Sequence, residues 1–199
     1  MLLIPVVLVF SGPAVEAGIM VFVADLSGAA ESPPNGSRGI GTARVDFDST
    51  GHTMRVRAEF SGLSSPTTAA HIHASTAVAG TGTAGVATTT PTFPGFPAGV
   101  LSGSYDMTFD MTLAASYRAA FITANGGTPG GAEAALLTAL TDGKAYLNIH
   151  TSEFPAGEIR GFLTAVPEPG HAVLLAACAM GAVLWRRSRQ CRAADQTEV

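Results

Sequence analysis

Alternating apolar and polar side chains run through the middle of the chain and predict β-strands, because successive side chains of a strand point to opposite faces. Residues 41–48 and 53–60 each place their apolar side chains on one face, and residues 104–112 do so most regularly. The residues between the first two segments, Ser49–His52, predict a hairpin turn. His52 is then a solvated turn residue, and we assign it no chemistry.

The remaining pattern predicts an all-β fold with one or two short helices. A first strand is expected at residues 19–24, another around Ala70–His73, and a strand, tight connection and second strand over residues 145–161. Helical periodicity appears only at residues 113–124 and 132–140. Several short antiparallel strands with one helical excursion predict an antiparallel β-sandwich or a partly closed barrel.

One stretch, residues 74–99, has no such pattern. It is rich in Thr, Gly and Pro and aperiodic except around Val86–Thr90. Glycine and proline favour turns and interrupt regular structure. We therefore expect a long connection that contains one short strand.

Polar residues interrupt the apolar pattern of three predicted strands. Because side chains at i and i+2 share a face, placing Ile72 in the core turns His71 and His73 away from it. The same parity, applied to the last two strands, places further polar side chains on the face opposite the core. The six residues expected on this face are His71, His73, Asn148, His150, Glu158 and Arg160.

Two interpretations of this polar face stay open. In the first, which we prefer, the histidines hydrogen-bond to neighbouring strands, and Glu158 and Arg160 form a cross-strand ion pair. In the second, His71, His73 and His150 bind Cu or Zn, with a carboxylate orienting the ligands. The His-x-His pair at residues 71 and 73 resembles the copper ligands of Cu/Zn superoxide dismutase, which is also a β-sandwich.

Composition excludes several classes of protein. A formal net charge of −4 with 13% charged residues does not fit a nucleic-acid-binding protein. The two cysteines, Cys178 and Cys191, lie in or beyond a C-terminal apolar segment, so the body has no disulfide framework. The sequence contains no nucleophile elbow, P-loop, dinucleotide fingerprint or His-Glu-x-x-His motif. We therefore expect that the protein is not an enzyme.

The first 17 residues resemble a signal peptide. An apolar run over residues 1–10 is followed by Val15 and Ala17, which fit the small residues required before a signal peptidase site. We predict cleavage after Ala17 and export of the chain.

The C-terminal part predicts a membrane anchor. Pro167, Glu168 and Pro169 precede an uncharged apolar stretch at residues 172–185, and an arginine cluster follows it at once. This three-part arrangement resembles a PEP-CTERM sorting segment, here residues 166–192 with a short tail at 193–199. The resemblance implies anchoring in the inner membrane, processing by an exosortase, and then a place on the cell surface or in the extracellular matrix. The arginines are Arg186, Arg187 and Arg189.

The body, residues 18–165, resembles a CHRD domain, a family named from the extracellular protein chordin. The similarity lies in Leu26–Ala29 with Glu31 and Pro33-Pro34, in Ala70–His73, and in the closing segments Tyr146–Thr151 and Pro155–Gly161. The resemblance implies a β-rich extracellular module, and we expect an exported binding or structural module with no cofactor. Its ligand, whether matrix, polysaccharide or protein, stays open, and a Cu- or Zn-dependent redox or storage protein is the alternative.

Overall fold

The computed structural model describes residues 18–167. The predicted signal peptide, Glu168, Pro169, the apolar segment and the arginine cluster of the sorting segment lie outside the described residues. Within residues 18–167 there is no helix with the length and apolar character needed to cross a bilayer. The compact unit that carries the candidate site ends at Ala165.

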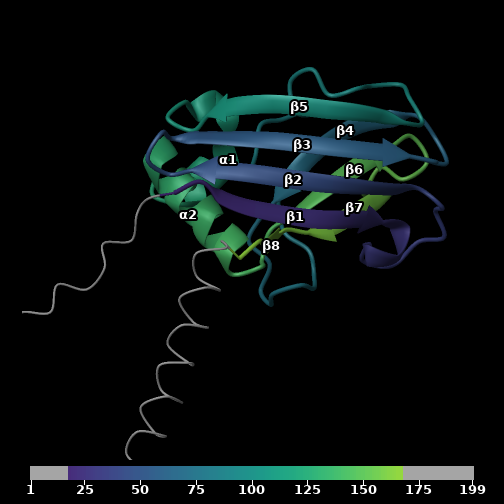
Figure 1. The fold of residues 1–199 in the computed structure, drawn as a ribbon, viewed down its shortest axis with the longest axis horizontal. Coiled ribbons are helices and arrows are strands. Elements are labelled where there is room, and N and C mark those ends of the chain that lie inside the picture. Colours follow the sequence, from purple (N-terminus) through teal and green to yellow (C-terminus); the bar gives the residue numbers. More distant parts are fainter. Residues whose placement is uncertain (1–17, 168–199) are drawn as a thin grey trace, which may run out of the picture. The chain divides into compact units, whose positions relative to one another are not determined.

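One antiparallel sheet of eight strands forms the body (Figure 1). Its order is β4-β6-β7-β1-β2-β3-β5, and β8 pairs with β1. In Figure 1, β5, β3, β2 and β1 stand side by side in front, and β4, β6 and β7 lie behind them. The sheet therefore curls into a half-barrel, as one of our two predictions had it, rather than forming the two sheets of a sandwich. The strands are β1 (Met20–Ser27), β2 (Ile40–Asp48), β3 (Thr53–Ser61), β4 (Thr67–His73), β5 (Gly103–Asp110), β6 (Tyr146–Thr151), β7 (Ile159–Phe162) and β8 (Thr164–Ala165).

The alternation in the sequence correctly identified the core face of the central strands. Phe22 of β1 pairs with Val45 of β2, which pairs with Val56 of β3, and all three side chains are fully buried. Burying such side chains contributes roughly 1.5–3 kcal/mol each, before the entropy cost of ordering them. The predicted hairpin turn joins β2 and β3.

The helices agree with the sequence pattern only in part. α2 (Pro129–Thr141) lies at the second predicted position, and the side chain of Thr128 accepts a hydrogen bond from the Gly131 N–H at its start. The first predicted helix is wrong in extent. A 3-10 turn, η2 (Ala114–Ser116), is followed by extended Tyr117 and then by the short α1 (Ala119–Ala124). The hydroxyl of Tyr117 bonds to the carbonyl of Met111 in the core, which interrupts the helix.

His52 occupies the β2–β3 turn, as predicted, with a positive φ of 52°. It is not only a solvated turn residue, however. Its Nδ1 lies 2.9 Å from a carboxylate oxygen of Glu133 on α2. The contact connects the hairpin turn to the helix, which the sequence separation of the two residues concealed.

Residues 74–99, which we call the edge segment, run along the free edge of β4. The Ala87 and Phe93 N–H groups donate to the carbonyls of Ile72 and Ala70. In return, the Ile72 N–H donates to the Thr88 hydroxyl at 3.0 Å. The strand expected around 86–90 is reduced to isolated bridges at Val86 and Thr88. Side-chain and main-chain groups of the edge segment thus satisfy a strand edge that would otherwise be unpaired.

The edge segment also fills the gap between β4 and β5, the two outer strands of the sheet order. Phe93 is fully buried and stacks on Tyr105 of β5, with 5.6 Å between ring centroids. Phe96 stacks on Phe60 of β3 at 5.5 Å. These aromatic side chains complete the core where the half-barrel is open.

Gly161 provides a test of the close packing between β7 and β1. A Cβ added there would lie 2.2 Å from the backbone oxygen of Asp25, so we expect Gly161→Ala to destabilise the full-length chain by roughly 3 kcal/mol. Gly130 in α2 has open space around it, and Gly130→Ala should stabilise by roughly 0.5–1 kcal/mol. Urea unfolding measures both changes in stability. Equal effects of the two substitutions would contradict the close packing at Gly161.

Candidate metal centre

Two adjacent strands bring the three histidines together. β4 carries His71 and His73 on one face, and β6 carries His150 opposite Ala69 of β4. The ring centroids are 5.9 Å apart for His71 and His73, 5.3 Å for His71 and His150, and 5.7 Å for His73 and His150. One nitrogen of each ring lies within 4.8 Å of the others. We call these residues the three-histidine cluster.

A backbone carbonyl orients each imidazole. His71 Nε2 lies 2.7 Å from the Pro91 oxygen, and His73 Nδ1 lies 2.9 Å from the Ala84 oxygen, both in the edge segment. His150 Nδ1 lies 3.0 Å from the carbonyl of Pro155 in the β6–β7 connection. A carbonyl oxygen only accepts hydrogen bonds, so each of these ring nitrogens carries the hydrogen. The other nitrogen of each ring is left with a lone pair.

These remaining nitrogens are buried and have no hydrogen-bond partner among the described residues: His71 Nδ1, His73 Nε2 and His150 Nε2. Burial lowers the pKa of His71 and of His73 to about 4, and it also lowers the pKa of His150. All three imidazoles are therefore neutral at pH 7, which is the state that binds a metal. A carbonyl on one ring nitrogen and a free lone pair on the other is the usual arrangement of a metal-ligating histidine.

The polar face that carries these histidines is buried. His71 and His73 are only 6% and 8% exposed, and both faces of β4 and β6 are covered around them. Ile72 and Ile149 enter the core on one side, whereas the edge segment covers the other. The histidines also bond to carbonyls of connecting segments rather than to neighbouring strands.

Asn148, Tyr146 and Arg160 share the face of the histidines. Asn148 pairs with His71 on one side and with Arg160 on the other. Tyr146 stacks on His73 with 4.9 Å between centroids, and the Arg160 guanidinium lies 4.7 Å from the Tyr146 centroid. Arg160 is 3% exposed, and its Nε donates to the carbonyl of Ala30 at 2.6 Å. A cation–π contact thus links the arginine to the ring that stacks on His73.

Glu158 does not join this cluster, contrary to our prediction. Its carboxylate is fully buried and accepts hydrogen bonds from the Ser37 hydroxyl at 2.6 Å, the Ser64 N–H at 2.5 Å and the Thr151 hydroxyl at 2.7 Å. The parity argument failed because Gly157 has a φ of 133°, which breaks the alternation before β7 begins.

Arg160 therefore has a different acidic neighbour from the one predicted. Its Nε lies 3.7 Å from a carboxylate oxygen of Glu31, and the predicted Glu158–Arg160 ion pair does not form. Burial raises the pKa of Glu31 to about 7, although Arg160 acts in the opposite direction. Our parity analysis missed Glu31 because it lies outside the strands. Its place in the family motif was the only signal for it.

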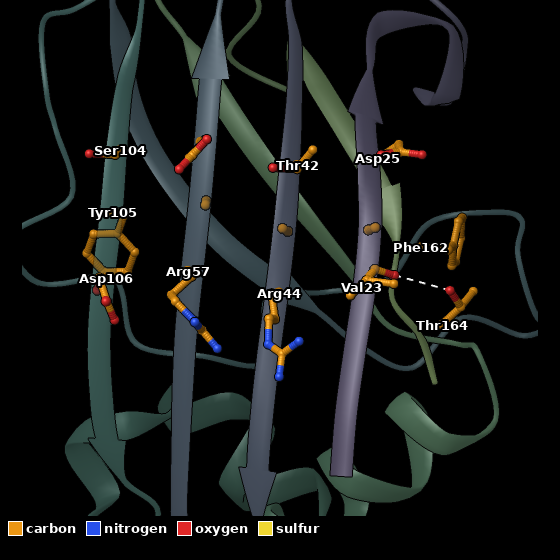
Figure 2. A pocket seen from close by; sticks show the side chains of 14 residues that line it. Val23, Asp25, Thr42, Arg44, Arg57, Ser104, Tyr105, Asp106, Phe162 and Thr164 are labelled. Atoms are coloured by element: carbon orange, nitrogen blue, oxygen red, sulfur yellow. Dashed lines mark hydrogen bonds between the residues drawn. The ribbon is translucent and has the colours of Figure 1, made fainter. Parts of the chain in front are cut away.

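A shallow hollow crosses the face of β1, β2, β3 and β5 (Figure 2). Exposed Arg44 and Asp106 and half-buried Arg57 lie along it. Both arginines pair with Asp46, so much of the positive charge is already matched. The hollow contains none of the three histidines, and we assign it no ligand.

Comparison with known proteins identifies the body of the chain. The family model described as the CHRD domain matches residues 22–163. This chain belongs to the CHRD family. The match covers the whole half-barrel core and includes the three-histidine cluster. No curated protein and no solved structure matches the chain.

Glu158 anchors the β6–β7 connection of this CHRD domain, and its removal should be costly. Burial alone would raise its pKa, but the hydrogen bonds from Ser37, Ser64 and Thr151 outweigh it and hold the pKa below 4.5. We expect Glu158→Gln to destabilise the protein by about 2 kcal/mol at pH 7, because the buried donors lose a charged acceptor.

The pH dependence follows from the direction of this shift. A depressed folded pKa contributes stability that is present above the unfolded value of 4.5 and is lost as the pH falls. The difference between the wild-type protein and Glu158→Gln should therefore shrink as urea unfolding is repeated below pH 4.5. Exposed Glu153 supplies the control, Glu153→Gln. A difference that is constant with pH would contradict the ionised state of Glu158.

Proposed function

We propose that this CHRD protein is an exported metal-binding module that holds one Cu or Zn ion at His71, His73 and His150. It acts by binding rather than by catalysis. The β-rich CHRD body is the scaffold, and β4, β6 and the edge segment form the binding site.

The single observation that supports this proposal is the set of three buried lone pairs in one cluster. Buried polar atoms nearly always have a partner, and an unpartnered one costs roughly 1–3 kcal/mol. Hydrogen bonding alone, the interpretation that we first preferred, accounts for the carbonyl-bound nitrogens and leaves the others unexplained. A metal ion would provide one partner for all three.

The donor set fits a borderline transition metal. Imidazole nitrogen binds copper and zinc well, whereas Mg²⁺ and Ca²⁺ prefer oxygen ligands. Among the described residues, the three histidines form a possible ligand group without a carboxylate or thiolate. The outer carbonyls of Ala84, Pro91 and Pro155 would keep the rings oriented as the ion enters.

Export rests on the two ends of the chain. Cleavage after Ala17 by signal peptidase and processing by an exosortase at the PEP-CTERM segment would deliver the CHRD body to the cell surface or the extracellular matrix. A matrix component, a polysaccharide or another protein is the partner class expected there. No nucleic acid is involved.

Metal analysis of the purified full-length chain tests the binding site. After incubation with Cu or Zn and removal of free ions, we expect about one ion per chain in the wild-type protein and less than about a tenth of that in His73→Ala. His52→Ala, which removes a histidine outside the cluster, should bind as the wild-type protein does. Unchanged binding in His73→Ala, or none in the wild-type protein, would refute the proposal.

The sorting proposal has its own test. Deleting residues 172–189 should release the protein from the membrane fraction into the medium, because the apolar segment and its arginines would form the anchor. Cell fractionation measures how much protein is in the membrane fraction and how much is in the medium. A second variant, in which the three arginines are replaced by glutamine, is measured in the same way. Continued membrane association of the deleted chain would contradict the anchor.

A further inference from the structure

The charge of the three-histidine cluster and its number of donor atoms influence which ion it selects. Resting on the metal site proposed above, we infer that the cluster selects monovalent copper, Cu(I), over Zn(II) and Cu(II). Three features carry the inference: the neutral donor set, the number of donors, and the arginine behind Tyr146.

The donor set carries no negative charge. The ligand group consists of three imidazoles, and no carboxylate or thiolate of the described residues belongs to it. Burying an ion without a counter-charge costs more for a dication than for a monocation, because the solvation energy lost grows with the square of the charge. A closed site of neutral nitrogens therefore penalises Zn(II) and Cu(II) more than Cu(I).

The two nearby acids do not compensate. Glu158 faces Ser37, Ser64 and Thr151 on the other side of the sheet. Glu31 lies 3.7 Å from the Arg160 Nε, but burial raises its pKa to about 7, so at pH 7 its carboxyl carries only part of a negative charge and leaves part of the positive charge of the arginine unmatched.

The number of donors points in the same direction. Zinc in structural sites is almost always four-coordinate, and a catalytic zinc with three protein ligands adds water or substrate. The three free nitrogens are buried, and His71 and His73 lie beneath the edge segment, so a water ligand would have to enter a closed site. Cu(I), by contrast, is stable with three nitrogen donors alone and needs no further ligand.

Arg160 places a positive charge behind the ring that stacks on His73. The guanidinium lies 4.7 Å from the Tyr146 centroid, and that centroid lies 4.9 Å from the one of His73. A unit charge at about 10 Å changes affinity roughly tenfold for each additional positive charge on the ion, at an effective dielectric constant of about 20. Arg160 thereby favours the ion of lower charge.

Competition titrations of the full-length chain test the inference. Cu(I) is supplied without oxygen from a bicinchoninate complex, and Zn(II) and Cu(II) are supplied from chelators of known affinity. We expect one Cu(I) per chain, bound at least about tenfold more tightly than either dication, and loss of this binding in His73→Ala. Zn(II) or Cu(II) bound as tightly as Cu(I) would overturn the inference while leaving the metal site intact. Failure to bind any of the three ions would instead refute the proposed function.

Two charge variants test the contribution of the arginine. Arg160→Gln keeps a donor near the Ala30 carbonyl and removes the charge, so the ratio of Zn(II) to Cu(I) affinity should rise roughly tenfold. Exposed Arg118, whose charge also reaches His71, provides a second variant, Arg118→Gln, in which solvent screening should make the rise smaller. If the ratio of Zn(II) to Cu(I) affinity were unchanged in both variants, positive charge would not contribute to the selectivity.

Discussion

The fold depends on how the backbone N–H and C=O groups at the free edge of β4 find hydrogen-bond partners. β4 and β5 are the outer strands of a curled sheet that does not close on itself. An open edge exposes unpaired backbone groups and favours association with other chains. The edge segment removes this liability with N–H groups that donate to Ala70 and Ile72, and it fills the opening with Phe93 and Phe96.

The same segment shapes the candidate site. The carbonyls of Ala84 and Pro91 orient His73 and His71, and the Gly82 carbonyl accepts a hydrogen bond from Arg160 at 3.0 Å. The edge segment therefore both covers the free edge of β4 and orients the histidines. Changes in this segment should affect the stability of the half-barrel and the geometry of the cluster together, because both use one stretch of backbone.

The polar side chains of β6, β7 and the connection between them lie on opposite faces of the sheet and have different roles. On the histidine face, Tyr146 connects His73 to Arg160 by stacking. On the other face, Glu158 accepts hydrogen bonds from Ser37 and Ser64 and so ties the β6–β7 connection to the β1–β2 and β3–β4 connections. The closing motif of this CHRD domain thus contains a structural anchor and a candidate site, separated by the thickness of the sheet.

Alternation alone determined the central strands, the core face with Val45 and Val56, and the shared face of His71 and His73, because side-chain direction in a regular strand is a local property. It failed at Glu158, where Gly157 breaks the regular backbone. It could not reveal that the polar face is buried, since the covering segment is aperiodic and acts through backbone carbonyls that sequence patterns do not encode. Only the tertiary structure decided that the three histidines meet in a closed cluster, because this depends on which strands pair and on what covers them.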